Sequence, residues 1–274
     1  MEWQFGAPSP AAAPYFGVFY LATTQHLTVS DTQRAGTGHL HFFLQGSGYK
    51  DFPKSRRQAH AVSISGPSTL CQNFALNGPA RLFGISLLPK CWNGIVPAQA
   101  DDLTNTGRDA AELFGPSLLQ LHARLQECRD LADMVRMVEA YFLARRTPIN
   151  RGQLRVIEGI REWLDSAVAP QLETLHARFD MSDRQLARIA NRYWGAPPKA
   201  LARKYTALKT ASHIVARDGD VPAEALHHYS AQSHIIREVR RVTGQTPRQL
   251  RTQASSMMRL ALNPANFWEL QDRG

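Results

Sequence analysis

Two similar stretches in the second half of the chain carry cationic and amide side chains that could read DNA. The first is QLETLHARFDMSDRQLARIANRY over residues 171–193, and the second is PAEALHHYSAQSHIIREVRRVT over residues 222–243. An Arg side chain can donate two hydrogen bonds to O6 and N7 of guanine, and a Gln side chain can pair with N6 and N7 of adenine. These residue types therefore point to recognition of base edges, provided that short helices hold them outward.

The first stretch has the local signals of two short helices joined by a turn. One helix is expected from residue 171 to about residue 178. Ser182 is then an N-cap candidate, with Gln185 three residues later as its capping-box partner. Gly195 should end the second helix, because Gly readily adopts the left-handed conformation that follows a helix. The second helix should bury Leu186, Ile189 and Ala190 and present on its opposite face Arg184, Ala187, Arg188 and Asn191.

The second stretch repeats this organisation about 50 residues later. Its short first helix should turn Ala225 and Leu226 inward. Ser230 is expected to be the N-cap of the next helix, and Gly244 should end that helix. The second helix should bury Ile235, Ile236 and Val239 and leave exposed Gln232, Ser233, His234, Arg237 and Arg241. One helix over residues 199–216 should connect the two units.

These stretches resemble the DNA-binding part of the AraC/XylS family of transcriptional regulators. The second unit closes with R-V-T-G-Q-T-P-R-Q-L-R over residues 241–251, which is similar to that family's R-x-x-G-x-T-P-x-x-x-R. Q-S-H over 232–234 is similar to the entry of the family's second recognition helix, and S-D-R-Q-L-A-R over 182–188 follows its S-x-R-x-L-x-R. Two departures are Ile235, where Phe is usual, and His228, where the second turn usually has Gly.

The resemblance implies a role for each exposed side chain, because each unit of that family places its second helix in the major groove. The candidates for base contacts are Arg184, Ala187, Arg188, Gln232, Ser233, His234 and Arg237. The candidates for phosphate contacts, which position the protein without specifying sequence, are Lys199, Arg203, Lys204, Arg240 and Arg248. For any single Arg, the alternative is an ordinary solvated helix face.

The first half of the chain has the pattern of short strands separated by turn residues. The expected strands are Phe16–Leu21, His39–Leu44, Ala61–Ser65 and Arg81–Leu87. AraC/XylS regulators commonly carry an N-terminal cupin-like barrel, and these strands resemble that arrangement. S-G-P over 65–67, F-G-I-S-L-L-P over 83–89, L-T-N over 103–105 and L-F-G over 113–115 are similar to one N-terminal type.

A helical segment should follow these strands. The expected helices are Asn105–Phe114, Ser117–Cys128 and Leu131–Leu143, and Arg145–Arg151 has the composition of a linker. The last two helices could pack in the core or form a dimer face. The tail after residue 254 is apolar for a terminus, so we expect it to dock on the protein.

A metal site and a redox site are the competing interpretations of the first half. His39 and His41 would lie on one face of a strand, as in metal-binding cupins, but Gln45 stands where a carboxylate ligand would be expected. Cys71 and Cys91 would sense oxidants only if they were close together and their thiols had lowered pKa values. We expect no metal, no cofactor and no catalytic residue.

Composition limits the remaining classes of protein. Hydrophobic residues make up 43 % of the 274 residues, which excludes a wholly disordered chain. The net charge is +9, and residues 150–251 hold 17 Lys and Arg against 10 Asp and Glu, so an anionic partner should bind the second half. Three cysteines fit a reducing cytoplasm. A membrane span and a secretory signal are not expected.

These observations predict an α+β protein with a cupin-like N-terminal barrel and an all-α DNA-binding part. The expected divisions are residues 1–147 for sensing or dimerisation, 148–254 for DNA binding and 255–274 for the tail. The expected function is sequence-specific transcription regulation in response to a small-molecule effector. Double-stranded DNA, a second copy of the chain and RNA polymerase are the candidate partners, and activation or repression is left open. The alternatives are a metal-dependent cupin enzyme and a DNA-binding protein whose first half only dimerises.

Overall fold

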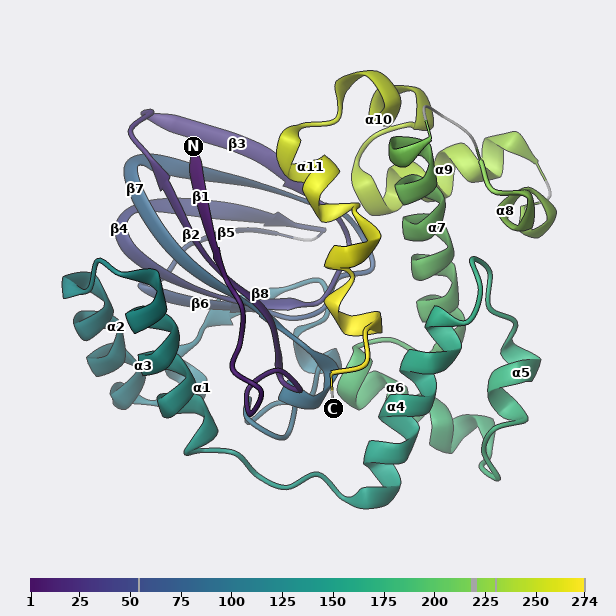
Figure 1. Ribbon diagram of the computed structural model, residues 1–274, viewed down its shortest axis with the longest axis horizontal. Coiled ribbons are helices and arrows are strands. Elements are labelled where there is room, and N and C mark those ends of the chain that lie inside the picture. The colour runs from purple at the N-terminus through teal and green to yellow at the C-terminus, as the bar shows by residue number, and fades with distance from the viewer. Residues whose placement is uncertain (54, 218–220, 230, 274) are drawn as a thin grey trace.

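A β-rich first half and a helical second half lie side by side in the computed structural model of the chain (Figure 1), which describes residues 1–53, 55–217, 221–229 and 231–273. The strands are β1 Glu2–Gly6, β2 Phe16–Thr24, β3 Thr28–Gln33, β4 Gly38–Phe52, β5 Ser55–Gln58, β6 Val62–Ser65, β7 Gln72–Leu87 and β8 Gly107–Asp109. The helices of the first half are α1 Ala111–Phe114, α2 Pro116–Glu127 and α3 Leu131–Leu143. Those of the second half are α4 Arg151–Asp165, α5 Leu172–His176, α6 Asp183–Trp194, α7 Pro198–Ala216, α8 Ala223–His228, α9 Gln232–Thr243, α10 Pro247–Gln253 and α11 Ser256–Ala261. The expected α+β class is confirmed.

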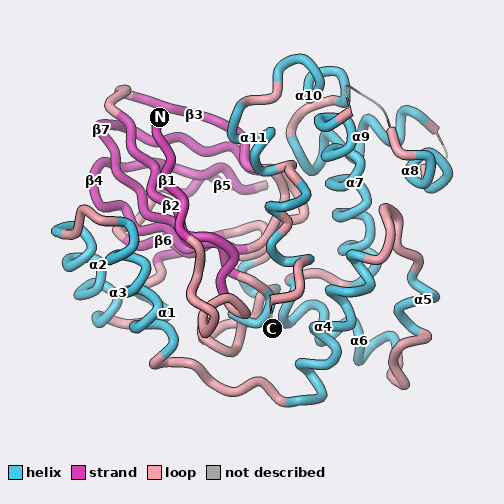
Figure 2. Tube along the Cα trace, viewed as in Figure 1, coloured by secondary structure: helices cyan, strands magenta, loops and turns pink. Residues whose placement is uncertain are grey.

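The strands form one antiparallel sheet around the long strand β7. Its order is β1-β2-β7-β4-β6-β8, with β3 also paired to β7 and β5 to β4. The first part of β7 pairs with β3 and its second part with β2, while β4 runs along its other side. Among the described residues the path of pairs does not close into a ring, so β1 and β8 are its two ends. Figure 2 shows the curvature of these strands, drawn in magenta.

The alternation of β4 explains which face of the sheet is which. Leu40, Phe42 and Leu44 are buried in the main core, whereas His39 and His41 alternate with them and face a cavity. This is the period of two that a pleated strand imposes. Helix α2 packs on the core side, where the His122 ring is 2.8 Å from the Phe43 carbonyl oxygen. The expected placement of both histidines on one face is confirmed, with their rings 5.6 Å apart.

The segment before α1 differs from the sequence prediction. A helix was expected over Asn105–Phe114, but residues 107–109 form β8 against β6 and only Ala111–Phe114 is helical. Asn105 has a positive φ of 56°, and its side chain holds the Thr69 backbone N–H and hydroxyl. Pairing with a distant strand therefore overrides the local helix preference. The expected helices α2 and α3 are confirmed to within a residue.

Helix α7 is the centre of the second half. It contacts α4, α5, α6, α9 and α10, and it buries Leu201, Tyr205, Leu208, Ala211 and Ile214. One continuous core of buried apolar residues extends from the sheet into these helices. The two halves therefore share packing rather than meeting through a linker alone. None of the described helices combines the length and apolar character that a membrane span needs.

The C-terminal segment returns to the sheet. After α11 it forms two short 3₁₀ helices, η3 Pro264–Asn266 and η4 Trp268–Leu270. Figure 1 shows this yellow segment between the sheet and α7. The expected docking is confirmed, because the segment buries Met258, Leu262, Phe267 and Leu270.

Candidate nucleic-acid interface and ligand cavity

The first helix-turn-helix unit consists of α5 and α6. The Ser182 hydroxyl accepts the Gln185 backbone N–H, and the Gln185 side chain accepts the Ser182 backbone N–H, so the expected capping box is confirmed. Helix α5 ends at His176, about two residues earlier than expected. Gly195 ends α6 with φ 76°, the left-handed conformation that favours Gly at this position.

Helix α6 presents the expected faces. Leu186, Ile189 and Ala190 are buried, which fixes the helix against its neighbours. Arg184 and Arg188 lie on the solvent side and Ala187 is half-buried between them. The side chains proposed to read bases are therefore free to meet a partner surface.

The second unit consists of α8 and α9 and departs further from the sequence prediction. Ser230 lies outside the described residues, and the N-cap of α9 is Ala231, which makes no side-chain cap. Gly244 ends α9 with φ 79°, as expected. His228 is the last residue of α8. Its backbone is therefore helical, and this turn needs no Gly there.

Two apolar residues of the second unit are exposed rather than buried. Leu226 is 53 % exposed and Ile236 is 38 % exposed, whereas their neighbours Ala225 and Ile235 are buried. Successive residues of a helix point about 100° apart. One member of each adjacent pair therefore faces the core and the other faces solvent.

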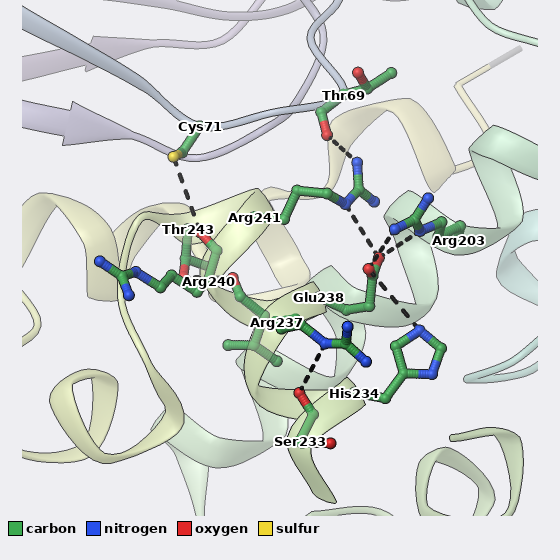
Figure 3. Close-up of polar contacts among 11 residues, drawn as sticks. Thr69, Cys71, Arg203, Ser233, His234, Arg237, Glu238, Arg240, Arg241 and Thr243 are labelled. Atoms are coloured by element: carbon green, nitrogen blue, oxygen red, sulfur yellow. Dashed lines mark hydrogen bonds and ion pairs between the residues drawn. The ribbon is translucent and has the colours of Figure 1, made fainter. Parts of the chain in front are cut away.

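The expected reading face of α9 is only partly free. Gln232, Ser233 and Arg237 are exposed. His234 is half-buried, with its ring 5.1 Å from that of Tyr229. The Arg237 Nε donates to the Ser233 carbonyl oxygen at 3.4 Å, within the helix (Figure 3).

Glu238 organises the cations around α9, as Figure 3 shows. Its buried carboxylate accepts two hydrogen bonds from Arg203 at 2.6 and 2.5 Å and one from Arg241 at 3.1 Å. Burial opposes ionisation, but these bonds and the two positive charges hold the pKa of Glu238 below its ordinary value. A carboxylate three residues after buried Ile235 lies on the buried side of a helix, which is the sequence signal that could have predicted a cation partner.

Two basic residues, Lys204 and Arg241, differ from their expected exposure. Lys204 is 2 % exposed, so it is not available to a DNA phosphate in this structure; its Nζ lies 3.4 Å from the Gly36 carbonyl oxygen. Burial lowers the pKa of Lys204 to about 8. Arg203 pairs with Glu238, but its side chain is 57 % exposed, so it stays a candidate for a phosphate contact. Arg241, expected on the exposed side, donates to the Thr69 carbonyl oxygen at 2.6 Å. The exposed candidates for phosphate contacts are Lys199, Arg203, Arg240 and Arg248.

The first half of the chain holds the C-terminal ends of both recognition helices. On α6, the Ala100 N–H donates to the Arg192 carbonyl oxygen at 2.9 Å. The Thr104 hydroxyl donates to the Gly195 carbonyl oxygen at 2.7 Å. On α9, the Cys71 N–H donates to the Arg241 carbonyl oxygen at 3.0 Å, and the Ala35 N–H donates to that of Val242 at 2.7 Å. The last carbonyls of a helix have no partner within it. The first half therefore satisfies them and fixes where α6 and α9 lie relative to each other.

A cavity of about 860 Å³ lies inside the β-rich half. Its wall is mainly apolar and includes side chains of the sheet and of the C-terminal segment, among them Trp3, Phe43, Phe74, Leu82, Leu260 and Trp268. This volume is within the range of small-molecule sites, which are typically apolar with a few polar groups. No sequence pattern had indicated a cavity of this size.

A chain of hydrogen bonds crosses the polar end of the cavity. The Lys50 ammonium donates to the Gln33 side-chain oxygen at 2.6 Å, and the Gln33 amide donates to Nε2 of His39 at 2.7 Å. The other ring nitrogen of His39 is 3.3 Å from the Tyr20 hydroxyl, which is 2.7 Å from Nε2 of His41. Because a Gln amide nitrogen can only donate, His39 carries its proton on Nδ1 and the bonds run in one direction to His41.

The electrostatics of this chain favour neutral histidines beside one cation. Burial lowers the pKa of His41 to about 3, and burial with the His41 and Lys50 neighbours lowers the pKa of His39 well below its ordinary value. Burial also lowers the pKa of Lys50 to about 7. Among the described residues no carboxylate forms an ion pair with Lys50. The polar end therefore offers hydrogen-bond donors, and a positive charge when Lys50 is protonated.

The competing metal and redox sites gain no support from this geometry. Within the described ranges no group of three His, Cys, Asp or Glu residues could hold a metal ion. The three cysteines are free thiols. Burial raises the pKa of both Cys71 and Cys91, which makes each thiol less reactive.

Comparison with known proteins gives a distant likeness of architecture. No family model matches the sequence, and no curated protein matches it. An apo variant of ToxT from Vibrio cholerae is similar at 10 % identity and a TM-score of 0.45, over 86 % of this chain and 98 % of that chain. ToxT with an unsaturated fatty acid bound gives 9 % identity and 0.45, over 90 % and 94 %. ToxT bound to (E)-4-(8-methylnaphthalen-1-yl)but-3-enoic acid gives 10 % identity and 0.44, over 91 % and 98 %.

Proposed function

We propose that the protein is a sequence-specific, double-stranded DNA-binding transcription regulator of the AraC/XylS type. The observation that carries this proposal is the pair of helix-turn-helix units whose second helices, α6 and α9, present exposed Arg side chains. In this proposal Arg184 and Arg188 read one major-groove segment, and Gln232 and Arg237 read the next. Segments one helical turn apart lie about 34 Å from each other on the same face of DNA.

The exposed phosphate candidates complete the interface. The exposed cations of the helical half in this group are Lys199, Arg203, Arg240 and Arg248. Their contacts would position the units without adding specificity. The DNA-binding part spans residues 148–254 in this proposal, and dimerisation and contact with RNA polymerase belong to the same expectation.

The cavity supports the second part of the proposal, an effector that controls DNA binding. Its apolar wall suits an apolar ligand body, and Lys50 with the donor chain suits one anionic or hydrogen-bond-accepting head group. Residues 31–34 and 36 line this cavity, and Ala35 in the same segment holds the end of α9. A ligand that moves this segment would change the position of one recognition helix relative to the other. Such a ligand would shift DNA affinity only by its differential affinity for the two arrangements.

Selection from a random duplex pool tests DNA reading directly. The wild type should enrich a motif with two elements about one helical turn apart. Arg188→Ala should relax one element and Arg237→Ala the other, while Arg124→Ala on α2, an exposed Arg far from both units, should change neither. Enrichment of no motif, with binding that only weakens as salt rises, would mean non-specific charge attraction and would refute the proposal.

A further inference from the structure

The C-terminal segment forms one wall of the cavity, opposite the sheet. Met257, Leu260 and Trp268 line the same space as the side chains of β1, β4 and β7. Figure 1 shows the yellow segment running between the strands and α7. A ligand in this cavity would therefore contact the sheet and the C-terminal segment together.

Two exposed apolar side chains, one from the C-terminal segment and one from β1, line this cavity. Leu260 on α11 is 44 % exposed and Phe5 on β1 is 51 % exposed, and both belong to its lining. Phe5 is stacked on Trp3 at 6.2 Å between ring centroids. An apolar ligand body that covered these side chains would remove their apolar surface from water, which favours binding.

The segment is fastened to the sheet by a few specific contacts. The Arg34 Nε donates to the Ala261 carbonyl oxygen at 2.7 Å, and its guanidinium lies 4.4 Å from the centre of the Phe267 ring. The Arg273 side chain donates to the Gly17 carbonyl oxygen at 2.7 Å. Trp268 packs so closely on Gly17 that a Cβ there would come within 2.9 Å of the Trp268 Cβ. These contacts hold the wall in place without a covalent link.

The same segment is continuous with the second recognition helix. Helix α10 begins three residues after Gly244 at the end of α9, and α11 begins three residues after α10 ends. The Tyr205 hydroxyl of α7 donates to the Glu269 carboxylate at 3.1 Å. Arg34, which fastens the segment, is adjacent to Ala35, which holds the Val242 carbonyl oxygen of α9. Movement of the C-terminal segment would therefore be transmitted to α9 in two ways, along the chain through α10 and through the adjacent residues Arg34 and Ala35.

We propose that residues 255–273 are half of the effector site and that ligand binding is coupled to the docking of this segment and, through it, to α9. This inference rests on the proposed effector-controlled function. A ligand that contacts the docked segment stabilises docking, and loosening the segment weakens ligand binding by the same coupling free energy.

8-Anilinonaphthalene-1-sulfonate is a suitable probe, because it has an apolar aromatic body and one anionic head. Its affinity for the full-length protein can be measured by fluorescence titration. Leu260→Asp places a negative charge on the proposed wall and should weaken binding at least about tenfold, equivalent to about 1.4 kcal/mol. Leu27→Asp, at an 83 % exposed position outside the cavity, is the matched control and should bind like the wild type. Lys50→Met should also weaken binding.

Hydrogen exchange gives a readout that does not depend on a substitution. Saturating probe should slow amide exchange in residues 256–271 as well as in the strands that line the cavity. Equal probe affinity for Leu260→Asp and Leu27→Asp, or protection confined to the strands, would overturn the inference.

A DNA arm separates this inference from the proposed function. The probe should change the affinity of the wild type for its selected duplex. In Arg34→Gln, saturation with the probe should change the affinity for the same duplex less than it does in the wild type. An unchanged effect of the probe on DNA binding in Arg34→Gln would overturn the coupling. If the wild type selects no duplex, the regulatory function fails, whereas the titration and exchange results still decide whether the segment belongs to the ligand site.

Discussion

Replacing Gly195 by Ala should destabilise the protein more than the same change at Gly244. Both residues follow a recognition helix in the left-handed conformation, where an L side chain costs about 1–2 kcal/mol. The two sites differ in their surroundings. A Cβ at Gly195 would overlap the Thr104 hydroxyl, whereas a Cβ at Gly244 would come to 3.0 Å from a Thr32 methyl and 3.4 Å from the Cys71 sulfur.

The magnitude follows from the contact that must be given up. To admit the new methyl group, Thr104 must move and lose its 2.7 Å hydrogen bond to the Gly195 carbonyl oxygen, which contributes about 1 kcal/mol. We therefore expect Gly195→Ala to lower the free energy of unfolding by about 2–3 kcal/mol. For Gly244→Ala we expect about 1–2 kcal/mol.

A double-mutant cycle identifies the cause. Thr104→Ala alone should lose about 1 kcal/mol, because it removes the same hydrogen bond. In the Thr104→Ala background, Gly195→Ala should then cost only the strain of a left-handed Ala backbone. The two changes should therefore be non-additive by about 1 kcal/mol. Urea unfolding followed by tryptophan fluorescence measures all four proteins. Equal losses at Gly195 and Gly244, or strict additivity in the cycle, would refute the idea that Thr104 closes over the end of α6.

Three further predictions test the electrostatics. Glu238→Gln should lower the free energy of unfolding by about 2 kcal/mol at pH 7. Because the pKa of Glu238 is held below its ordinary 4.5, the wild type should lose its stability advantage over Glu238→Gln as the pH falls below about 4.5. Urea midpoints of both proteins at pH 7 and pH 4 test this expectation. Because the pKa of Lys50 is lowered from 10.5 to about 7, the stability of the wild type should rise with pH between 7 and 10.5. Lys50→Met should be more stable than the wild type at pH 7, and its stability should rise less over this pH range. An equal rise in both proteins would contradict the lowered pKa of Lys50. Arg240→Ala should reduce the slope of log affinity for duplex DNA against log salt by about 0.9, whereas Lys204→Met should leave that slope unchanged, and equal slopes for both variants would contradict the burial of Lys204.

The sequence predicts local structure well where neighbouring residues determine it. The capping box of Ser182 and Gln185 and the helix ends at Gly195 and Gly244 depend on residues a few positions apart, and all three are confirmed. The alternation over His39–Leu44 likewise predicts which side chains share a face. In each case the physical cause lies within one turn or one strand.

The sequence fails where the deciding partner is far along the chain. Lys204 has the pattern of an exposed helix cation, yet Gly36 lies against it from 168 positions away. Residues 107–109 form a strand because β6 is available to pair with them. The exposure of Leu226 and Ile236 depends on which member of an adjacent apolar pair the rest of the fold covers. None of these outcomes follows from local pattern.

Part of the polar chain in the cavity could be predicted from local sequence, and part of it depends on distant partners. His39 and His41 could be placed on one face from β4 alone, but Tyr20 comes from β2 and Gln33 from β3. Lys50 lies farther along β4, beyond the two register shifts of its pairing with β7. These irregularities cannot be read from composition. The polar chain is therefore a product of sheet register, which is why the sequence indicated a pair of histidines and not the residues that join them.

The segment from Gln33 to Gly36 explains how one site could influence another in this fold. Gln33 joins Lys50 to His39 inside the cavity, and the next residue, Arg34, fastens the C-terminal segment. Ala35 holds the end of α9, and the Gly36 carbonyl oxygen faces Lys204 on α7. Four consecutive residues thus contact the ligand cavity, its outer wall, a recognition helix and the central helix. A head group that bound Lys50 in place of Gln33 would free one end of this segment, so the remaining contacts would have to readjust. Of the two recognition helices, we therefore expect α9 to respond first to a ligand in the cavity, because α6 is held by Ala100 and Thr104, which lie outside this segment.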